Sequence, residues 1–275
     1  MSERPEHLYP SPHKVAALLP PPVRVKLVSL LPDRQEVRRA RVRLARRFLR
    51  GDGLEIGALH LPLPMPRGAH ARYVDRMDEH DLVGEYPELE GHDLVHVDVV
   101  DDGERLSTVP DASVDFVVAN HFLEHTEDPI GTLAQHTRVL RPGGILFLAN
   151  PDPRETFDRD RPLTTIEHLA RDHRDGPEVS RQEHYDEWVR VVERAPEPDV
   201  AARSAELRDA SYSIHFHVWT PSVFAELVHH CARKEGIPLG LEAVVPVRHE
   251  FITILRKRTP GGPPPAAITT SELPR

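Results

Sequence analysis

Short apolar runs alternate with helical and polar stretches over much of the chain, and this alternation is its clearest structural signal. The runs are rich in Val, Ile and Leu, as strands buried on both faces of a parallel sheet are. Five of them are predicted to be strands: 52–58, 71–76, 94–100, 113–120 and 145–151. The alternation of strands with helical periods predicts a doubly wound, Rossmann-like α/β fold.

The pattern continues after a long interruption. A helical period covers about 127–140, and another over 221–236 closes at a glycine. Two apolar runs at 239–247 and 249–257 then complete a seven-stranded sheet, predicted to be mostly parallel with an antiparallel terminal strand.

Residues 152–213 do not fit the alternation. They form a polar insertion with helical stretches at 163–173 and 181–195, expected to be a lid because the insertion follows the fifth strand. The resulting domain plan is an N-terminal arm and basic helix over 1–50, an α/β domain over 51–258 and a disordered Pro/Gly-rich tail over 259–275.

Charge is unevenly distributed. Residues 1–50 carry a surplus of eight positive charges, whereas the net charge of the whole chain is −9. The basic segment 34–50 reads as a helix with Val37, Leu44 and Phe48 on one side. Such a helix could bind anionic lipid or nucleic acid, or it could cap the acidic body through its arginines. The capping role is favoured because no aromatic stacking platform accompanies the charge.

Composition describes an ordinary globular protein, with 39% hydrophobic and 29% charged residues. No apolar run reaches the length of about 18 residues that a membrane span needs, and the first residues do not resemble a secretory signal. The single cysteine, Cys231, excludes an internal disulfide and is expected to pack in a helix. The cytoplasm is therefore the expected location.

Two phrases carry a family resemblance: DASVDFVVANHFLEHTEDP (111–129) and RVLRPGGILFLANP (138–151). In this order and at this separation they resemble the class I S-adenosylmethionine-dependent methyltransferases. The resemblance covers about 50–150 well and 215–257 more loosely. It implies S-adenosylmethionine as the cofactor, bound at the carboxyl ends of the strands.

The resemblance also implies which residues contact the cofactor. The expected set follows the first four strands: Glu55, Gly57, Ala58, Asp75, Arg76, Asp102, Gly103 and Asn120, with Asp98 as a competitor of Asp102. The glycine after the first strand lets backbone approach the cofactor, and the carboxylate after the second accepts the ribose hydroxyls. The first loop departs from the family, because GALHLP (57–62) keeps only the first glycine of the usual GxGxG.

A metal site is also suggested by resemblance. HFLEH (121–125) together with IHFHVWT (214–220) looks like the metal site of the Hen-type small-RNA 2′-O-methyltransferases. The matching positions are His121, Glu124, His125 and His215, with His121 standing where that family has a Glu. Three imidazoles and one carboxylate favour Mn, Fe, Co or Zn over Mg.

Other roles remain open for these residues. His125, with His121 near the methyl group, could act as a general base without a metal. Alternatively, Glu124 could cap the helix while His125 packs against the cofactor. On the lid, Arg154, Arg159 and Arg161 could bind an anionic substrate or form ion pairs, and His184, Tyr185 and Trp188 could stack on a ring or pack internally.

The predicted function is S-adenosylmethionine-dependent O-methylation of a small-molecule, sugar or nucleoside-like hydroxyl, with a divalent metal ion as one of the open alternatives for assistance. A nucleic-acid substrate is not expected, because the body is acidic and no RNA-binding domain is recognisable. The alternatives are N-methylation of a small molecule and a non-catalytic cofactor-binding partner subunit that docks through the basic helix.

Overall fold

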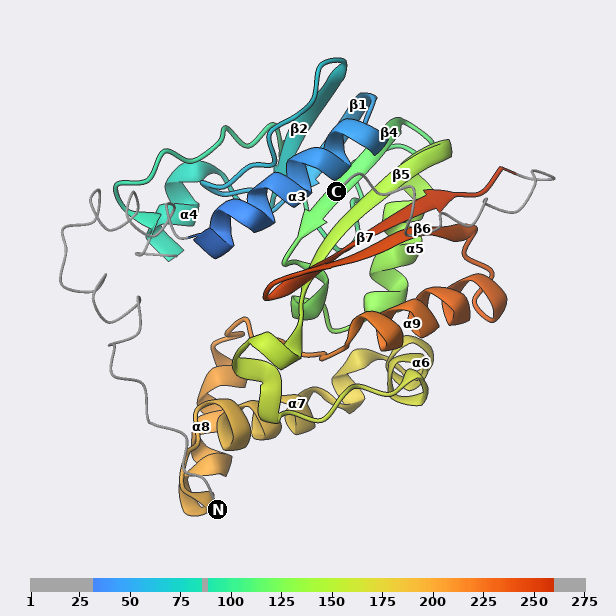
Figure 1. Ribbon diagram of the computed structural model, residues 1–275. Helices are drawn as coiled ribbons and strands as arrows, with labels where there is room; N and C mark the ends of the chain where they lie inside the picture. The colour runs from blue at the N-terminus through green and yellow to red at the C-terminus, as the bar shows by residue number, and fades with distance from the viewer. Residues whose placement is uncertain (1–31, 86–88, 260–275) are drawn as a thin grey trace, which may run out of the picture.

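A seven-stranded sheet organises the protein, for which a computed structural model describes residues 32–85 and 89–259 (Figure 1). The strand order is β3-β2-β1-β4-β5-β7-β6. The strands are β1 (Gly51–Ile56), β2 (Ala69–Asp75), β3 (Val99–Val100), β4 (Val114–Asn120), β5 (Leu140–Pro151), β6 (Leu239–Val247) and β7 (Glu250–Lys257). The predicted tail and most of the predicted arm lie outside the described residues.

Strand direction confirms the predicted fold class. Neighbours from β3 to β5 pair in parallel, whereas β7 is antiparallel to both β5 and β6. The antiparallel strand is therefore the last in the chain, and it is inserted between β5 and β6.

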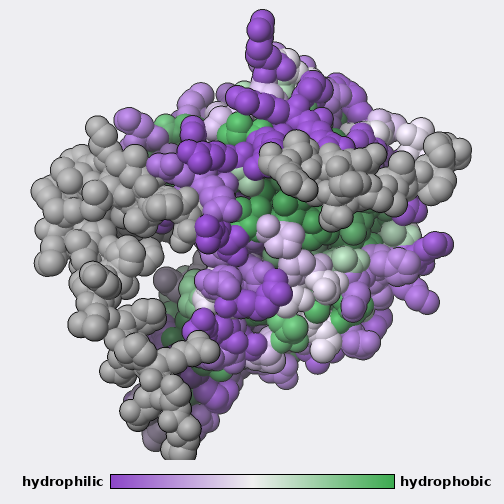
Figure 2. All heavy atoms as spheres, in the orientation of Figure 1, coloured by the Kyte–Doolittle hydropathy of each residue, from purple (hydrophilic) through white to green (hydrophobic). Residues whose placement is uncertain are grey.

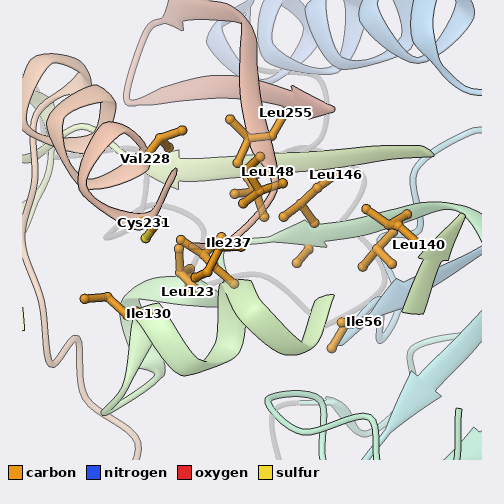
Figure 3. Packing of buried hydrophobic residues seen from close by; sticks show 14 of the residues in the cluster. Ile56, Leu123, Ile130, Leu140, Leu146, Leu148, Val228, Cys231, Ile237 and Leu255 are labelled. Carbon is orange, nitrogen blue, oxygen red and sulfur yellow. The ribbon is translucent and has the colours of Figure 1, made fainter. Parts of the chain in front are cut away.

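Helices cover both faces of the sheet. On one face lies α3 (Pro32–Phe48), whose apolar side packs on β4, β5 and β7. On the other face, α5 (Pro129–Val139) and α9 (Pro221–Arg233) pack against Leu146, Leu148 and Leu255 (Figure 3). Cys231 lies fully buried in this second core, as expected for a packing residue.

The basic helix α3 has a structural role in the described part of the chain. Val37 and Leu44 are buried in the core, and Arg41 forms an ion pair with the buried Glu250. Arg248 is also paired with Glu36 of the helix. Figure 2 shows the outward side of α3 as hydrophilic, bordering apolar side chains of the neighbouring sheet face.

The predicted third strand is wrong in its length. Only two residues of the predicted 94–100 join the sheet, because the preceding residues leave the edge to cover the loop after β1. There the Val95 amide donates to the Leu59 carbonyl. Val97 packs with Leu82 of α4 (Glu79–Glu85).

The insertion forms a helical layer below the sheet in the view of Figure 1. Its helices are α6 (Ile166–Asp175), α7 (Arg181–Glu187), which continues as a π-turn over Trp188–Val192, and α8 (Glu197–Asp209), which the sequence pattern did not predict. It has its own small core, which includes Tyr185, Val189 and Leu207. The extended segment 213–219 then returns the chain to α9.

None of the helices in the described ranges combines the length and apolarity that a membrane crossing requires.

Candidate functional site

The carboxyl ends of β1, β2 and β4 bring the expected cofactor residues together. Because these strands are parallel and in register, Gly57, Asp75 and Asn120 follow neighbouring positions at one edge of the sheet. Gly57 has φ +63°, and the nearest atom to a Cβ built there is 4.0 Å away. The side-chain oxygen of Asn120 is buried without a hydrogen-bond partner. An accessible backbone face and an orphaned acceptor fit the amino-acid end of S-adenosylmethionine.

Glu55 fixes the loop that follows β1. Its two carboxylate oxygens lie 2.8 and 3.1 Å from the Leu63 amide, which donates to them. Burial raises the pKa of this carboxyl to about 7 despite that hydrogen bond. The predicted contact with the cofactor ammonium group remains a prediction, since the structure uses the carboxylate to hold the loop.

The loop itself takes a path unlike a GxGxG turn. Leu59 adopts φ +49°, a conformation that costs a non-glycine residue energy. The His60 ring lies 4.1 Å from the His92 ring, centroid to centroid. The Leu59 and His60 side chains therefore pack against residues that precede β3, whereas Leu61, at the position of the third glycine, is exposed.

Asp102 and Gly103 lie in the loop after β3. A Cβ on Gly103 would be 2.6 Å from the Ile56 side chain and 2.9 Å from the Phe122 ring, so only glycine fits there. Asp98 instead accepts a hydrogen bond from the Tyr73 amide at 2.8 Å and so stabilises the sheet edge. The geometry thus leaves Asp102 as the better candidate for an adenine contact.

A polar cavity of about 840 Å³ opens beside this loop. It is bounded by the loop, one side of α5 from Gly131 to Arg138 and the lid around Arg181. Glu104 lines it, and burial together with neighbouring acidic groups raises the pKa of that carboxyl to about 7. Of the expected cofactor residues, Asp102 is the one that lines this space.

His121 occupies the junction after β4 in an unexpected conformation. Its φ of +51° is in the left-handed region, and the helical turn begins only at Leu123. The ring lies between two carboxylates, with Nε2 2.8 Å from Glu250 and Nδ1 3.4 Å from Glu124. Burial alone would lower its pKa, but the two carboxylates raise it to about 9.

His121 differs in this way from the other three predicted ligands. Its two ring nitrogens face carboxylates, and it is not among the residues whose ligand atoms converge. Its role as a metal ligand stays a prediction.

The other three predicted ligands converge. The ligand atoms of Glu124, His125 and His215 all lie within 4.8 Å of one another, and we call these residues the crevice cluster. Glu124 is fully buried, and neither of its carboxylate oxygens has a hydrogen-bond partner. A buried carboxylate that accepts no hydrogen bond, with His121 3.4 Å away, is an arrangement that a bound cation would stabilise further.

Hydrogen bonds orient both imidazoles of the crevice cluster. His125 Nδ1 lies 2.9 Å from the Ile214 carbonyl, and His215 Nδ1 lies 2.7 Å from Asp158. Each contact engages Nδ1 and leaves Nε2 available, which is how proteins fix the tautomer of a metal-binding histidine. Asp158 is in turn paired with Arg161.

Electrostatics separates the roles within the cluster. Burial raises the pKa of the Glu124 carboxyl, but the surrounding imidazoles, led by His121, lower it overall, so the group is ionised. Burial lowers the pKa of His125, which keeps that ring neutral at physiological pH.

Asp158 and Glu250 are site residues that sequence reasoning missed. Asp158 lies in a short turn of the insertion, and Glu250 begins β7. The only sequence signal for Asp158 was its place among the arginines of the insertion. For Glu250 there was none, because its partners Arg41 and His121 are far away along the chain.

The residues expected to contact substrate are mostly engaged within the lid. Arg154 is paired with Asp152, and Arg161 with Asp158 and Glu187. His184 and Tyr185 are buried. Trp188 is half-buried, 5.6 Å from the exposed Phe157 ring, so these two aromatic side chains remain available to an acceptor.

Comparison with known proteins finds that part of the chain is similar to methyltransferases. The methyltransferase domain family profile matches residues 70–148. A probable S-adenosylmethionine-dependent methyltransferase of Mycolicibacterium smegmatis is 46% identical over 57 residues, which cover 20% of this chain and 22% of that protein. The matched stretch thus spans about a fifth of this curated relative.

Solved structures with similar folds include two methyltransferases. A SAM-dependent methyltransferase from Aquifex aeolicus is 13% identical with a TM-score of 0.45, covering 87% of this chain and 99% of that one. One from Methanosarcina mazei is 17% identical with a TM-score of 0.42, covering 78% and 97%.

Residues 70–148 thus match a methyltransferase domain, and this match supports the prediction of an enzyme. The match supports S-adenosylmethionine as the cosubstrate.

Proposed function

We propose that the chain catalyses S-adenosylmethionine-dependent O-methylation of a hydroxyl on a small-molecule, sugar or nucleoside-like acceptor. In this proposal Glu124, His125 and His215 hold one divalent transition ion. The observation that carries it is the buried Glu124 carboxylate, which accepts no hydrogen bond and faces two imidazoles whose Nδ1 atoms are already engaged. A small acceptor and a cytoplasmic location are parts of the same proposal.

Each residue of the proposed site has a distinct task. Gly57 and Asn120 would receive the amino-acid end of S-adenosylmethionine with the neighbouring Ala58, while Asp75, Arg76, Asp102 and Gly103 would hold its nucleoside. Glu124 supplies negative charge, and His125 and His215 supply neutral nitrogen ligands suited to Mn, Fe, Co or Zn. The bound ion would lower the pKa of the acceptor hydroxyl, the chemistry that a methyl transfer to oxygen needs.

The surrounding charges support this assignment. His121 balances Glu124 and Glu250, and Arg41 completes the neutralisation of Glu250. Asp158 orients His215 through the contact with its Nδ1. The resemblance of the two sequence phrases to the Hen-type metal site is a further support, applied to the site and not to its RNA substrate.

The test is a methyl-transfer assay on the untagged protein with labelled S-adenosylmethionine and matched panels of hydroxyl and amine acceptors. Activity on hydroxyls should depend on added Mn²⁺ or Co²⁺, and His125→Ala and His215→Ala should both abolish it while the Kd for S-adenosylmethionine changes less than about twofold. The exposed His229 provides a control as His229→Gln.

Two outcomes would change the proposal. Activity that survives metal removal and His215→Ala, yet is lost in His125→Ala, would indicate a general base whose neutral Nε2 is free because Ile214 engages Nδ1. Transfer to amines alone would exclude the hydroxyl acceptor.

A further inference from the structure

A second group of metal-competent side chains lies under the lid, apart from the crevice cluster. His168 and Asp172 face the same way on α6, one turn apart, and His184 comes from α7. His217 comes from the extended segment 213–219. One nitrogen from each of the three histidines lies within 4.8 Å of the other two. We call these four residues the lid cluster.

The distances in the lid cluster match those between metal ligands. His168 Nε2 lies 3.1 Å from His184 Nε2 and 3.0 Å from Asp172 Oδ2, and His184 Nε2 lies 3.7 Å from the same oxygen. In a tetrahedral zinc site with bonds of about 2.0–2.1 Å, neighbouring ligand atoms are about 3.3 Å apart. These three atoms therefore already approximate one face of a tetrahedron.

His217 provides the fourth ligand and an independent indication of a missing partner. The residue is 1% exposed, and its Nδ1 is buried without any hydrogen-bond partner. Its Nε2 lies 3.2 Å from the Glu127 carbonyl, which accepts the ring proton and leaves a lone pair on Nδ1. A buried imidazole nitrogen with no donor nearby is suited to a metal ion.

Further contacts orient the acidic ligand. The Ser180 hydroxyl donates to Asp172 Oδ2 at 2.8 Å, and Asp172 is itself fully buried. Hydrogen bonds of this kind to a ligand are typical of protein metal sites.

We propose that the lid cluster is a structural site for one divalent transition ion of the zinc type, bound by His168, Asp172, His184 and His217. The three imidazoles converge within 4.8 Å, and Asp172 contacts His168 and His184; four such ligands would close the coordination shell, as in structural sites. The imidazole-rich donor set selects zinc, cobalt, nickel or copper over magnesium and calcium. This assignment stands independently of the proposed reaction.

The position of the site gives the ion a role in building the crevice. It would join α6 and α7 to the segment 213–219, and His217 is two residues from His215. The amides of Phe216 and His217 both donate to the Glu124 carbonyl, so the same segment is attached to the methyltransferase domain. A bound ion would thus fix the lid in the conformation that presents His215 to Glu124.

The decisive experiment removes the crevice cluster first. The full-length, untagged Glu124→Gln/His125→Ala variant is stripped with chelator and titrated with Co²⁺, whose visible absorption is intense in tetrahedral sites. The expected result is one equivalent bound with a tetrahedral spectrum. Adding His168→Gln, at a partly exposed position, should weaken binding at least about 100-fold, whereas His229→Gln should not change it.

Elemental analysis gives a second measurement that does not depend on the folding of the double variant. After loading with Zn²⁺ and removal of excess, His168→Gln in an otherwise native chain should contain one equivalent less than the native protein. If both His168→Gln and Asp172→Asn retained the zinc content of the native protein, the proposal would be overturned. A folded double variant that shows no tetrahedral cobalt band would also overturn it, and would identify the lid cluster as a hydrogen-bonded network only.

Discussion

The crevice cluster and the lid cluster each take a histidine from the segment 213–219, but the charged groups around the two clusters differ. His215 and His217 are separated by a single residue, but the first faces Glu124 at the end of β4 and the second faces the lid helices. The crevice cluster has an ionised carboxylate and a neighbouring imidazolium, His121, whereas the lid cluster has three imidazoles and one carboxylate with a Ser180 hydrogen bond.

This difference would separate a reactive site from a structural one. Three proposed ligands near the expected cofactor residues would leave a coordination position for an acceptor, whereas four proposed ligands under the lid would leave none. Changes in the crevice cluster should therefore affect the reaction first, and changes in the lid cluster should affect metal content and lid order first.

The largest effect is expected for Glu124→Gln. The substitution keeps the size of the side chain but removes the negative charge of the crevice cluster, and we expect kcat to fall by about 100-fold or more. S-adenosylmethionine affinity should stay within about twofold, measured by calorimetry alongside steady-state rates. A variant with near-native kcat would show that Glu124 has only a structural role and would erase the contrast between the clusters.

Glu55 offers a second contrast, as a buried carboxylate without imidazoles around it. Its pKa is raised to about 7, whereas the pKa of Glu124 is lowered. The stabilisation linked to a raised carboxyl pKa is complete below the unfolded value and is lost as pH rises through the folded value. Between about pH 4.5 and 7.5 the native protein should lose about 3 kcal/mol of unfolding free energy relative to Glu55→Gln.

Chemical denaturation of both proteins at several pH values measures this difference. Glu55→Gln retains an oxygen that accepts the Leu63 hydrogen bond, so the variant should fold. Parallel pH profiles for the two proteins would show that Glu55 titrates normally and that the loop after β1 does not depend on its protonation.

The fold and the crevice cluster were largely predictable from the sequence because their signals are local. The Val-rich run before Asn120 marks β4, and a strand end followed at once by Glu124 and His125 places both at the sheet edge. The resemblance of IHFHVWT to a known site supplied His215. Five of the seven strands were predicted within two residues of their bounds for the same local reason, whereas β5 begins five residues earlier than predicted, at Leu140.

The departures from the predicted arrangement arose where distant contacts decide the structure. His121 lies outside the crevice cluster, with a positive φ and an ion pair with Glu250 that depends on β7 and α3. The third strand is short because its first half covers the loop after β1. The lid cluster requires the packing of α6 against α7, for which hydrophobic periodicity gives no register.

A smaller effect is expected for Asp158→Asn, which alters a residue that contacts only one cluster. The variant should weaken metal binding at the crevice cluster about 10- to 100-fold, because His215 loses its anionic hydrogen-bond partner. Cobalt titration in a His168→Gln background isolates that cluster. Unchanged affinity there, or an equal loss at the lid cluster, would mean that Asp158 supports the lid as a whole.

The smallest effect is expected for Arg171→Gln, next to the lid cluster. Arg171 Nη2 lies 3.1 Å from His168 Nδ1 and donates to it, which places the ring proton on Nε2, the nitrogen that faces His184 and Asp172. Metal binding needs the opposite tautomer, so this half-exposed arginine must turn away, and Glu183 lies 3.7 Å from it.

Removing the arginine should tighten cobalt binding at the lid cluster by about two- to fourfold, since exposed contacts of this kind contribute less than about 1 kcal/mol. Arg174→Gln, on the same helix and paired with Asp175, is the matched control. Weaker binding in Arg171→Gln would mean that the arginine orients His168 for the ion, and the lid cluster would then resemble the crevice cluster in relying on a charged neighbour.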